Sequence, residues 1–280
     1  MMRIDSHHHF WRYDPIEYDW IDDDMRVLRR DFLPNDLRPL LKETGIDGVI
    51  SVQARQTVDE TRWLIELARD HDFVRGVVGW LPLAGDDVER ELDQFSENRK
   101  LVAVRHVVQA ERDDQFILRD DFNRGVAALE RYQLRYDILI FERHLPQTTT
   151  FVDRHARQVF VLDHVAKPKI KAGEIEPWRT HIRELARRPN VYCKISGIVT
   201  EADSKTWTPE QLRPYFEVVL ESFGPRRLMF GSDWPVCLVG ASYALWHQTV
   251  ADWTAELSPD ERELIFGATA IEAYDLEARA

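Results

Sequence analysis

Cysteine is scarce in this sequence, and the two that occur, Cys193 and Cys237, form no CxxC motif. A disulfide framework is therefore not expected, and a reducing compartment is the simplest location. Cys193 lies within an apolar run, where we expect it to serve packing. The chain also lacks a run of about 18 apolar residues, which a membrane-spanning helix needs. Its N-terminus has no basic segment followed by an apolar one, so no signal peptide is expected and the predicted location is the cytoplasm.

Positive charge is in the minority, with 37 Lys and Arg against 49 Asp and Glu and a formal net charge of −12. This balance argues against a general binder of nucleic acid or of anionic membranes, because phosphate groups would be repelled. Neither GxGxxG nor GxxxxGK[ST] occurs, so no nucleotide cofactor is indicated. The nucleophile motif GxSxG is also missing, which disfavours a serine esterase.

What the 280 residues do contain is enough apolar material for a sizeable core, at 44% of the chain. Short runs rich in Val, Ile and Leu recur along the chain and are typical of strands buried on both faces. They lie at 4–9, 48–54, 74–81, 101–108, 134–140, 159–164, 191–196 and 227–233.

Helix-like segments separate these runs. Apolar residues recur at helical spacing over 57–70 and 121–133, and Thr208 and Ser258 each precede a proline in the pattern of a helix start. A last helix is predicted over 258–274. Eight strands alternating with helices predict an α/β fold, a TIM-like (β/α)₈ barrel that forms a single domain over 1–280. A doubly wound open sheet has the same alternation, but the count of eight favours the barrel.

Polar residues gather where the predicted strands end. In a barrel these ends form one face, on which the following loops build the active site. Polar groups inside strands are costly unless they are paired, so their recurrence at this position indicates a functional face. They are His7, His9, Gln53, Trp80, Arg105, His106, Asp137, His164, Lys194 and Asp233.

The run Asp5–Ser6–His7–His8–His9 is the first candidate site. Because side chains at i and i+2 share one face of a strand, His7 and His9 project together and His8 projects the other way. Two imidazoles on one face can supply two metal ligands. The alternative is a pair of hydrogen-bonded histidines; a purification tag is disfavoured, because the run is short and strand-like residues flank it.

Two more candidates end later strands. His164 follows the sixth strand and Asp233 follows the eighth, which neighbours the first strand in a closed barrel. Taken alone, His164 is a satisfied polar residue and Asp233 a turn aspartate before proline. Beside the histidine pair, both become ligand candidates, and Asp233 could accept a proton from an attacking water. A bound metal would lower the pKa of such a water toward about 7.

The combination of motifs resembles the amidohydrolase superfamily, in its amidohydrolase-2 type and its branch of sugar-lactone lactonases acting on L-fucono- and L-rhamnono-lactones. The resemblance extends from about Ile4 to Leu276. It is carried by IDSHHHFW at 4–11, VQA at 52–54, VGW at 78–80, VRH at 104–106, LDHVAKP at 162–168, KISG at 194–197 and GSDWP at 231–235.

The resemblance implies hydrolysis at the strand C-terminal face. It implies a metal site of His7, His9, His164 and Asp233 for one divalent ion, expected to be Zn²⁺, with Asp233 as the general base and acid. Binuclear relatives carry a bridging lysine or glutamate on strand four, where this chain has Arg105, so two metals are disfavoured. Some members of the branch hydrolyse lactones without a metal. The implied substrate is an aldonolactone, foremost an L-fucono-lactone, in the breakdown of L-fucose.

Substrate-binding residues are predicted at the same face. Arg105 and His106 could donate hydrogen bonds to the lactone carbonyl as negative charge grows on it, although a salt bridge is an alternative for Arg105. Lys167 could bind the product carboxylate or cover the rim, and Gln53 offers a donor and an acceptor to hydroxyl groups. Trp80 and Trp234 could face a sugar ring, although aromatic residues more often pack in the core.

Other hypotheses remain open at this point. Metal-dependent decarboxylation of an aromatic acid is an alternative reaction on the same scaffold, and a non-catalytic barrel that binds sugar acids is an alternative of another class. The aromatic segment 11–20 could form a lid or pack on the rim. The variation Ala268–Thr269–Ala270, where many relatives have Asn–Ala, is expected to affect packing rather than chemistry. The expected partner is a small-molecule lactone, and a homo-oligomer is left open.

Overall fold

The computed structural model describes residues 1–277 and contains one eight-stranded parallel sheet with strand order β1 to β8. Each strand pairs with the next one along the chain, which confirms the predicted (β/α)₈ barrel over the open sheet. The predicted domain reaches residue 280, and its last three residues lie outside the described part. The strands are β1 (Ile4–His8), β2 (Gly48–Val52), β3 (Val74–Gly79), β4 (Leu101–Val107), β5 (Arg135–Leu139), β6 (Phe160–Leu162), β7 (Val191–Ile195) and β8 (Leu228–Phe230).

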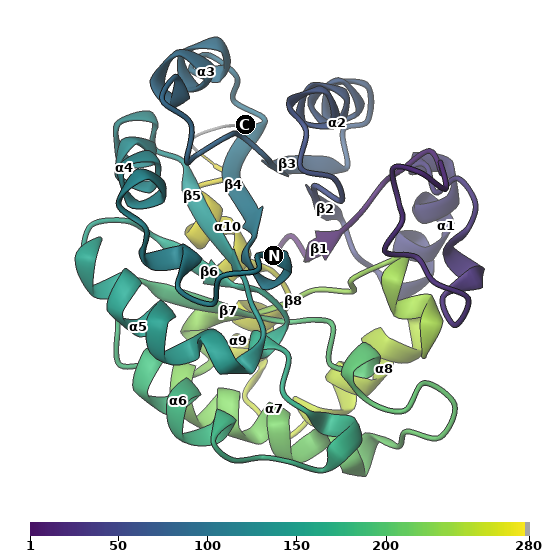
Figure 1. The fold of residues 1–280 in the computed structure, drawn as a ribbon. Helices are drawn as coiled ribbons and strands as arrows, with labels where there is room; N and C mark the ends of the chain where they lie inside the picture. The colour runs from purple at the N-terminus through teal and green to yellow at the C-terminus, as the bar shows by residue number, and fades with distance from the viewer. Residues whose placement is uncertain (278–280) are drawn as a thin grey trace.

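Helices surround the strands as an outer ring (Figure 1). The segment predicted as one helix over 258–274 is helical throughout, but a π-helical turn at Leu264–Ala268 interrupts the α-helix. The helices are α1 (Pro34–Thr44), α2 (Val58–Asp70), α3 (Val88–Phe95), α4 (Asp120–Leu129), α5 (Leu145–Arg154), α6 (Trp178–Leu185), α7 (Pro209–Phe223), α8 (Tyr243–Trp253), α9 (Pro259–Glu263) and α10 (Thr269–Tyr274).

The predicted helix starts follow from capping. Ser258 accepts a hydrogen bond from the amide of Glu261, whose carboxylate accepts one from the amide of Ser258, and Pro259 supplies the first helical residue. Thr208 and Gln211 form the same arrangement at the start of α7. Such reciprocal bonds satisfy backbone donors that the first turn of a helix leaves free.

The barrel closes through residues beyond the end of β8. The amide of Asp233 donates to the carbonyl of His7 at 2.7 Å, and the amide of His9 donates to the carbonyl of Trp234, also at 2.7 Å. A single parallel bridge joins His8 to Trp234. Strands β6 and β8 are thus shorter than predicted, and His164 and Asp233 lie in turns that follow them.

The opposite end of the barrel is filled by apolar side chains. Ile4, Val161 and Met229 pack there with Ala270 and Tyr274 of α10, which lies behind the strands in Figure 1. The hydroxyl of Thr269 donates to the carbonyl of Pro225 at 3.1 Å. The segment 268–270, where many relatives have Asn–Ala, therefore packs at this end of the barrel, as predicted. The C-terminal ends of the strands form the opposite face.

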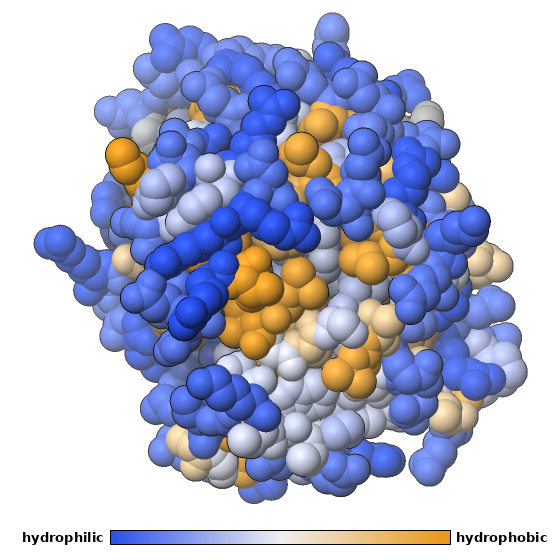
Figure 2. All heavy atoms as spheres, turned by 90° about the vertical axis from the view of Figure 1, so that its right-hand side faces the viewer, coloured by the Kyte–Doolittle hydropathy of each residue, from blue (hydrophilic) through white to orange (hydrophobic). Residues whose placement is uncertain are grey.

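The outer surface is mostly hydrophilic on the side that carries α1 and α8, with apolar groups gathered near its centre (Figure 2). Within residues 1–277, no helix combines the length and the apolar character that crossing a membrane requires. Cys193 is completely buried in β7, which agrees with the packing role expected for it.

Candidate active site

His7 and His9 come together at the mouth of the barrel, as the strand pattern predicts. Their Nε2 atoms lie 3.2 Å apart, and both side chains are buried. His8 lies on the other side of the strand, where its Nε2 is 2.9 Å from the hydroxyl oxygen of Ser51. The pairing of β1 with β2 shifts register between Asp5 and His8, an irregularity typical of strands beside active sites.

Asp233 faces this histidine pair. Its Oδ1 lies 3.4 Å from Nε2 of His9 and 3.7 Å from Nε2 of His7. Asp5, which was not predicted as a site residue, fixes this geometry. Its Oδ1 accepts hydrogen bonds from the backbone amides of both His7 and Ser232. The residue before Asp233 is thus tied to the strand that carries the histidines.

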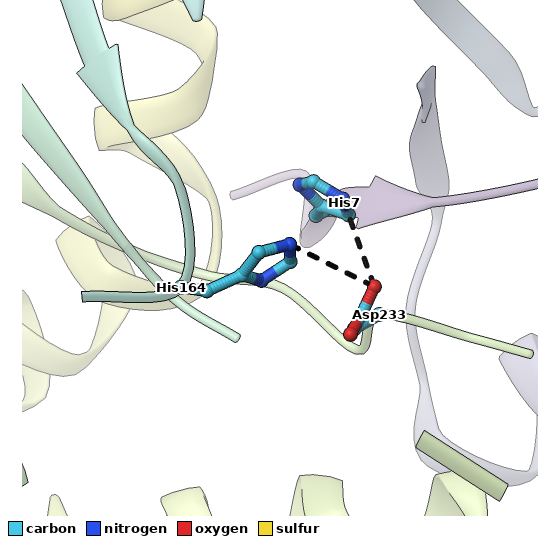
Figure 3. Close-up of side chains that lie close together, drawn as sticks. All are labelled: His7, His164 and Asp233. Carbon is cyan, nitrogen blue, oxygen red and sulfur yellow. Dashed lines mark ion pairs between the residues drawn. The ribbon is translucent and has the colours of Figure 1, made fainter. Parts of the chain in front are cut away.

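His164 completes the cluster from a turn after β6. Its Nε2 lies 4.0 Å from Oδ1 of Asp233, and its Nδ1 is 2.9 Å from the hydroxyl oxygen of Ser196. Figure 3 shows His7, His164 and Asp233 reaching toward one point from three separate segments. One ligand atom from each of the three lies within 4.8 Å of the other two.

These distances fit a divalent metal ion. Ligands around a tetrahedral Zn²⁺ with bonds of 2.0–2.1 Å lie roughly 3.3 Å apart, close to the separations among His7, His9 and Asp233. Nδ1 of His9 donates to the carbonyl of Val52 at 2.8 Å, so its Nε2 carries the lone pair that a metal needs. Burial lowers the pKa of His7 well below its usual value and that of His164 to about 4, which keeps both rings neutral and able to ligate.

Beneath the cluster lies a fully buried network of charged residues. Nζ of Lys194 is 2.5 Å from Asp137, 2.9 Å from Asp163 and 3.3 Å from Nδ1 of His7. The other oxygen of Asp163 accepts from Arg105 at 2.8 Å. The hydroxyl of Tyr274, from α10, donates to Asp137 at 2.7 Å. Two cations thus share Asp163, and a chain of polar contacts links the far end of the barrel to His7.

Sequence reasoning identified part of this network. It marked Asp137 and Lys194 as polar strand-end residues but assigned them no role, and it named Asp163 only as part of a motif. Spacing along the chain carries no signal for these pairs, because Asp137 comes from β5, Asp163 from the turn after β6 and Lys194 from β7. An acid or a base in an otherwise apolar strand was the available hint.

Arg105 and Gln53 form a unit inside the mouth. Nη2 of Arg105 donates to both the backbone carbonyl and the side-chain oxygen of Gln53, at 2.5 and 2.8 Å. These bonds orient the Gln53 amide, whose Nε2 is buried and has no hydrogen-bond partner within residues 1–277. Nε of Arg105 is likewise unpartnered. Both nitrogens are closed to solvent, so a substrate oxygen could accept from them only after the two side chains move.

His106 is held by partners on two sides. Nε1 of Trp80 donates to its Nδ1 at 3.3 Å, and its Nε2 lies 2.7 Å from Glu111. Because Nδ1 accepts, Nε2 carries the proton and donates to the Glu111 carboxylate. Burial lowers the pKa of His106, although Glu111 opposes this, so the ring is neutral near pH 7. Trp80 thereby contacts His106 through its ring edge.

The remaining predicted residues lie around the rim. Nζ of Lys167 is 3.8 Å from Glu201, a residue that the sequence analysis missed. Trp234 is only 2% exposed and packs edge-on against Phe10 and Phe32, so its predicted contact with a sugar ring stays a prediction.

The aromatic segment 11–20 packs on the rim. Trp11 pairs with Phe32 in an antiparallel bridge, and the Trp11 indole donates to the carbonyl of Arg30. Arg55, from the loop after β2, forms an ion pair with Glu17 and lies over the ring of Tyr18. The segment is thus fastened to a neighbouring loop of the mouth.

Comparison with known proteins decides the family. The model of the family described as Amidohydrolase matches residues 4–276. The chain belongs to this family. It is 42% identical to L-fucono-1,5-lactonase of Burkholderia multivorans and 35% identical to L-fucono-1,5-lactonase of Burkholderia ambifaria, each over 98% of this chain and 96% of the relative. The resemblance to lactonases inferred from the motifs is confirmed, and with it the expectation of an enzyme.

A solved amidohydrolase structure from Burkholderia multivorans with bound zinc has a TM-score of 0.94 to this amidohydrolase and 42% sequence identity. The match covers 98% of this chain and 99% of that one. The barrel therefore matches an experimental fold in the same family, and zinc is a ligand of that relative.

Proposed function

We propose that this amidohydrolase opens a sugar lactone to the sugar acid, with L-fucono-1,5-lactone as its preferred substrate and a role in L-fucose breakdown. The convergence of Asp233 with the Nε2 atoms of His7, His9 and His164 at the barrel mouth carries the proposal. Such a site suits attack of water on a carbonyl carbon. Identity of 42% over nearly the whole chain to a lactonase supports the choice of substrate.

In this proposal Asp233 is the general base. Burial alone would raise its pKa, but the neighbouring His164 and His9 outweigh this and keep the pKa of Asp233 below its usual value. The group is therefore a carboxylate at neutral pH and can accept a proton from the attacking water. It then returns the proton to the ring oxygen as the carbon–oxygen bond of the lactone breaks.

Arg105, Gln53 and His106 would stabilise and orient the substrate. The donors of Gln53 and Arg105 are buried, and after a movement of these side chains they would bind the carbonyl oxygen as negative charge develops on it, or a sugar hydroxyl. His106 already has a protein partner at each ring nitrogen, so it would reach a substrate only by exchanging one of them. Trp80 would present its ring beside His106, and Lys167, beside Glu201, would bind the product carboxylate.

One divalent ion, expected to be Zn²⁺, would be held by His7, His9, His164 and Asp233. When bound, it supplies Lewis-acid chemistry that polarises an oxygen and lowers the pKa of water. A single ion is favoured because Arg105 stands on β4 where binuclear relatives carry a bridging lysine or glutamate, and its guanidinium lies 3.4 Å from Nε2 of His7. The proposed step uses Asp233 as the proton acceptor whether or not the ion is essential.

The test is acid release from a panel of sugar lactones, followed with a pH indicator at neutral pH. We expect one proton per turnover above the spontaneous rate, fastest for L-fucono-1,5-lactone and stereochemically related rings. Release of carbon dioxide from hydroxylated aromatic acids would instead support the decarboxylase alternative. Binding of sugar acids without any lactone turnover, by folded protein supplied with zinc, would support the non-catalytic alternative.

A further inference from the structure

The turn after β6 has an unusual backbone. His164, Val165, Ala166 and Lys167 all have positive φ, between 48° and 60°, and none of them is glycine. Such residues each cost energy and persist only where the surroundings impose the conformation, often at functional sites. Here they form a tight turn in which the amide of Lys167 donates to the carbonyl of His164 at 2.8 Å.

This turn brings Lys167 to the same side as His164. With a hydrogen bond between residues i and i+3 there are about three residues per turn, so the first and fourth side chains are aligned. His164 reaches Asp233, and Lys167 reaches Glu201 of the short helix Val199–Glu201 that follows β7. The strained turn therefore carries both His164, which faces the proposed catalytic carboxylate, and Lys167, which faces Glu201.

Lys167 and Glu201 form a loose ion pair at the mouth. Their closest nitrogen–oxygen distance is 3.8 Å, longer than a charge-assisted hydrogen bond, and their side chains are 18% and 22% exposed. Lys167 also lies over the ring of Phe141. Lys167 is thus close enough to Glu201 for an electrostatic interaction, but at this distance the two side chains form no hydrogen bond.

Charge links this pair to the reaction centre. Burial raises the pKa of Glu201, which Lys167 opposes and the negative charge of Asp233 reinforces. The backbone amide of Lys167 donates to the carbonyl of His164, whose ring lies 4.0 Å from the carboxylate of Asp233. Lys167 therefore pairs with Glu201, which has no part in the proposed chemistry, and belongs to the turn that carries a neighbour of Asp233. The nearby Glu142 is paired with Lys169 instead.

The proposed reaction changes the charge of its ligand. Water adds to the carbonyl carbon, the bond from that carbon to the ring oxygen breaks, and the ring oxygen takes one proton. The resulting acid then loses its proton to solvent and becomes an anion at neutral pH. The substrate is neutral, whereas the product carries a carboxylate at the carbon beside Asp233, within the field of Lys167.

We propose that Glu201 is a product-release residue that competes with the new carboxylate for Lys167. This inference rests on the proposed lactone hydrolysis. Lys167 attracts the forming carboxylate. Glu201 partly neutralises the charge of Lys167 and repels the product anion once it has formed. The neutral lactone experiences little of either force. The pair therefore makes the site discriminate against its own product.

The experiment measures binding of L-fuconate by titration calorimetry to the wild-type protein, Glu201→Gln and Lys167→Gln. We expect Glu201→Gln to lower the dissociation constant about tenfold, equivalent to about 1.4 kcal/mol, and Lys167→Gln to raise it by a similar factor. Both effects should shrink as salt is added, since the charges are partly exposed. Glu174→Gln removes an equal charge at an exposed side chain beside Lys169 and should leave binding within about twofold.

L-Fucitol, a neutral polyol of the same carbon chain, separates charge from shape. Its affinity should be unchanged in Glu201→Gln, whereas a merely structural effect would alter both ligands. Equal L-fuconate affinity in wild type and Glu201→Gln overturns the inference, and so does a wild type that binds no sugar acid. Lactone turnover by the wild type is measured separately, so normal turnover with an inert Glu201→Gln change would remove the inference and leave the proposed function standing.

Discussion

The imidazole of His164 lies directly against Gly197, so closely that a Cβ atom on Gly197 would lie 2.5 Å from Nδ1 of His164. Gly197 also has a φ of +63°, a backbone conformation that residues other than glycine rarely adopt. The glycine of the KISG motif thus leaves room for the histidine ring and for its contact with Ser196. This relationship leads to a test of the position of His164.

We expect Gly197→Ala to displace His164 and to lower kcat by about tenfold or more, because a shift of about 1 Å at a catalytic site can cost two orders of magnitude. Gly173→Ala is the matched control, since Gly173 has φ +70° but no atom within 4 Å of the added Cβ. Both variants should lose about 1 kcal/mol of stability from backbone strain, measured by urea unfolding. Equal activity in the two variants would show that the ring of His164 tolerates the contact.

The strand and helix pattern was enough to predict the fold. Eight apolar runs, each short and followed by a helix, have few arrangements other than a barrel, and local caps at Thr208 and Ser258 act within three residues. The ends of β6 and β8 were placed too late. His164, predicted as the last residue of the sixth strand, lies in a left-handed turn that only tertiary contacts impose.

The metal candidates could be proposed from the sequence, because His7 and His9 are two residues apart at the end of β1 and motifs mark His164 and Asp233. Asp5, Asp163 and Glu201 could not. Each acts through a partner from a distant strand or loop, and the local sequence does not identify that partner. Long-range pairing of charges is decided by the closed barrel, where Lys194 of β7 meets Asp137 of β5 and Asp163 of the turn after β6.

Asp233→Asn tests the proposed base. Asparagine tolerates positive φ as well as aspartate does, so residue 233 can keep its φ of +57°. Its backbone amide can also keep the hydrogen bond that it donates to the carbonyl of His7. The variant should fold with a melting temperature close to that of the wild type. General base catalysis contributes about 10²–10⁴-fold, so kcat for the lactone should fall by about 10³-fold. A variant with more than a tenth of wild-type turnover would remove Asp233 from this role.

Metal content distinguishes His9 from its neighbour His8. We expect His9→Gln to weaken zinc binding by about 100-fold or more, a loss at least as large as that from removing an outer-shell partner. His8→Gln should retain one zinc per chain, because His8 contacts Ser51 on the other side of the strand. Elemental analysis after dialysis against a weak chelator measures both, independently of turnover. Equal zinc loss from the two variants would contradict the proposed ligand set.

Because Lys194 is buried beside Asp137, we expect substitutions of these two residues to have strongly coupled effects on the free energy of unfolding. Lys194→Met leaves Asp137 without a cation and weakens the neutralisation of Asp163, and breaking a buried pair typically costs about 3–5 kcal/mol. Adding Asp137→Asn removes the stranded charge while keeping an oxygen for the Tyr274 hydroxyl. The double variant should therefore be more stable than Lys194→Met alone in chemical denaturation. Strict additivity of the two losses would show that the pair does not interact energetically.

The buried carboxyl group of Glu60 should make the stability of the protein depend on pH. It lies fully buried in the first turn of α2, and one oxygen accepts hydrogen bonds from the amides of Ala54 and Arg55, which hold the loop after Gln53. Burial raises the pKa of Glu60 to about 7, although Arg55 opposes the shift. The folded protein then binds more protons than the unfolded chain between about pH 4.5 and 7, so this group makes stability fall as pH rises through that window.

Glu60→Gln keeps an acceptor for both amides and removes the titration. The free energy of unfolding of the wild type, relative to this variant, should decrease by at most about 3 kcal/mol from pH 4.5 to 7.5. Urea unfolding at several pH values measures the difference and cancels the contribution of every other group. Glu66→Gln, at an exposed position of the same helix, should follow the wild type throughout. A Glu60→Gln profile parallel to that of the wild type would mean that Glu60 is ionised in the folded protein without penalty, and that hydrogen bonds from the loop fully offset its burial.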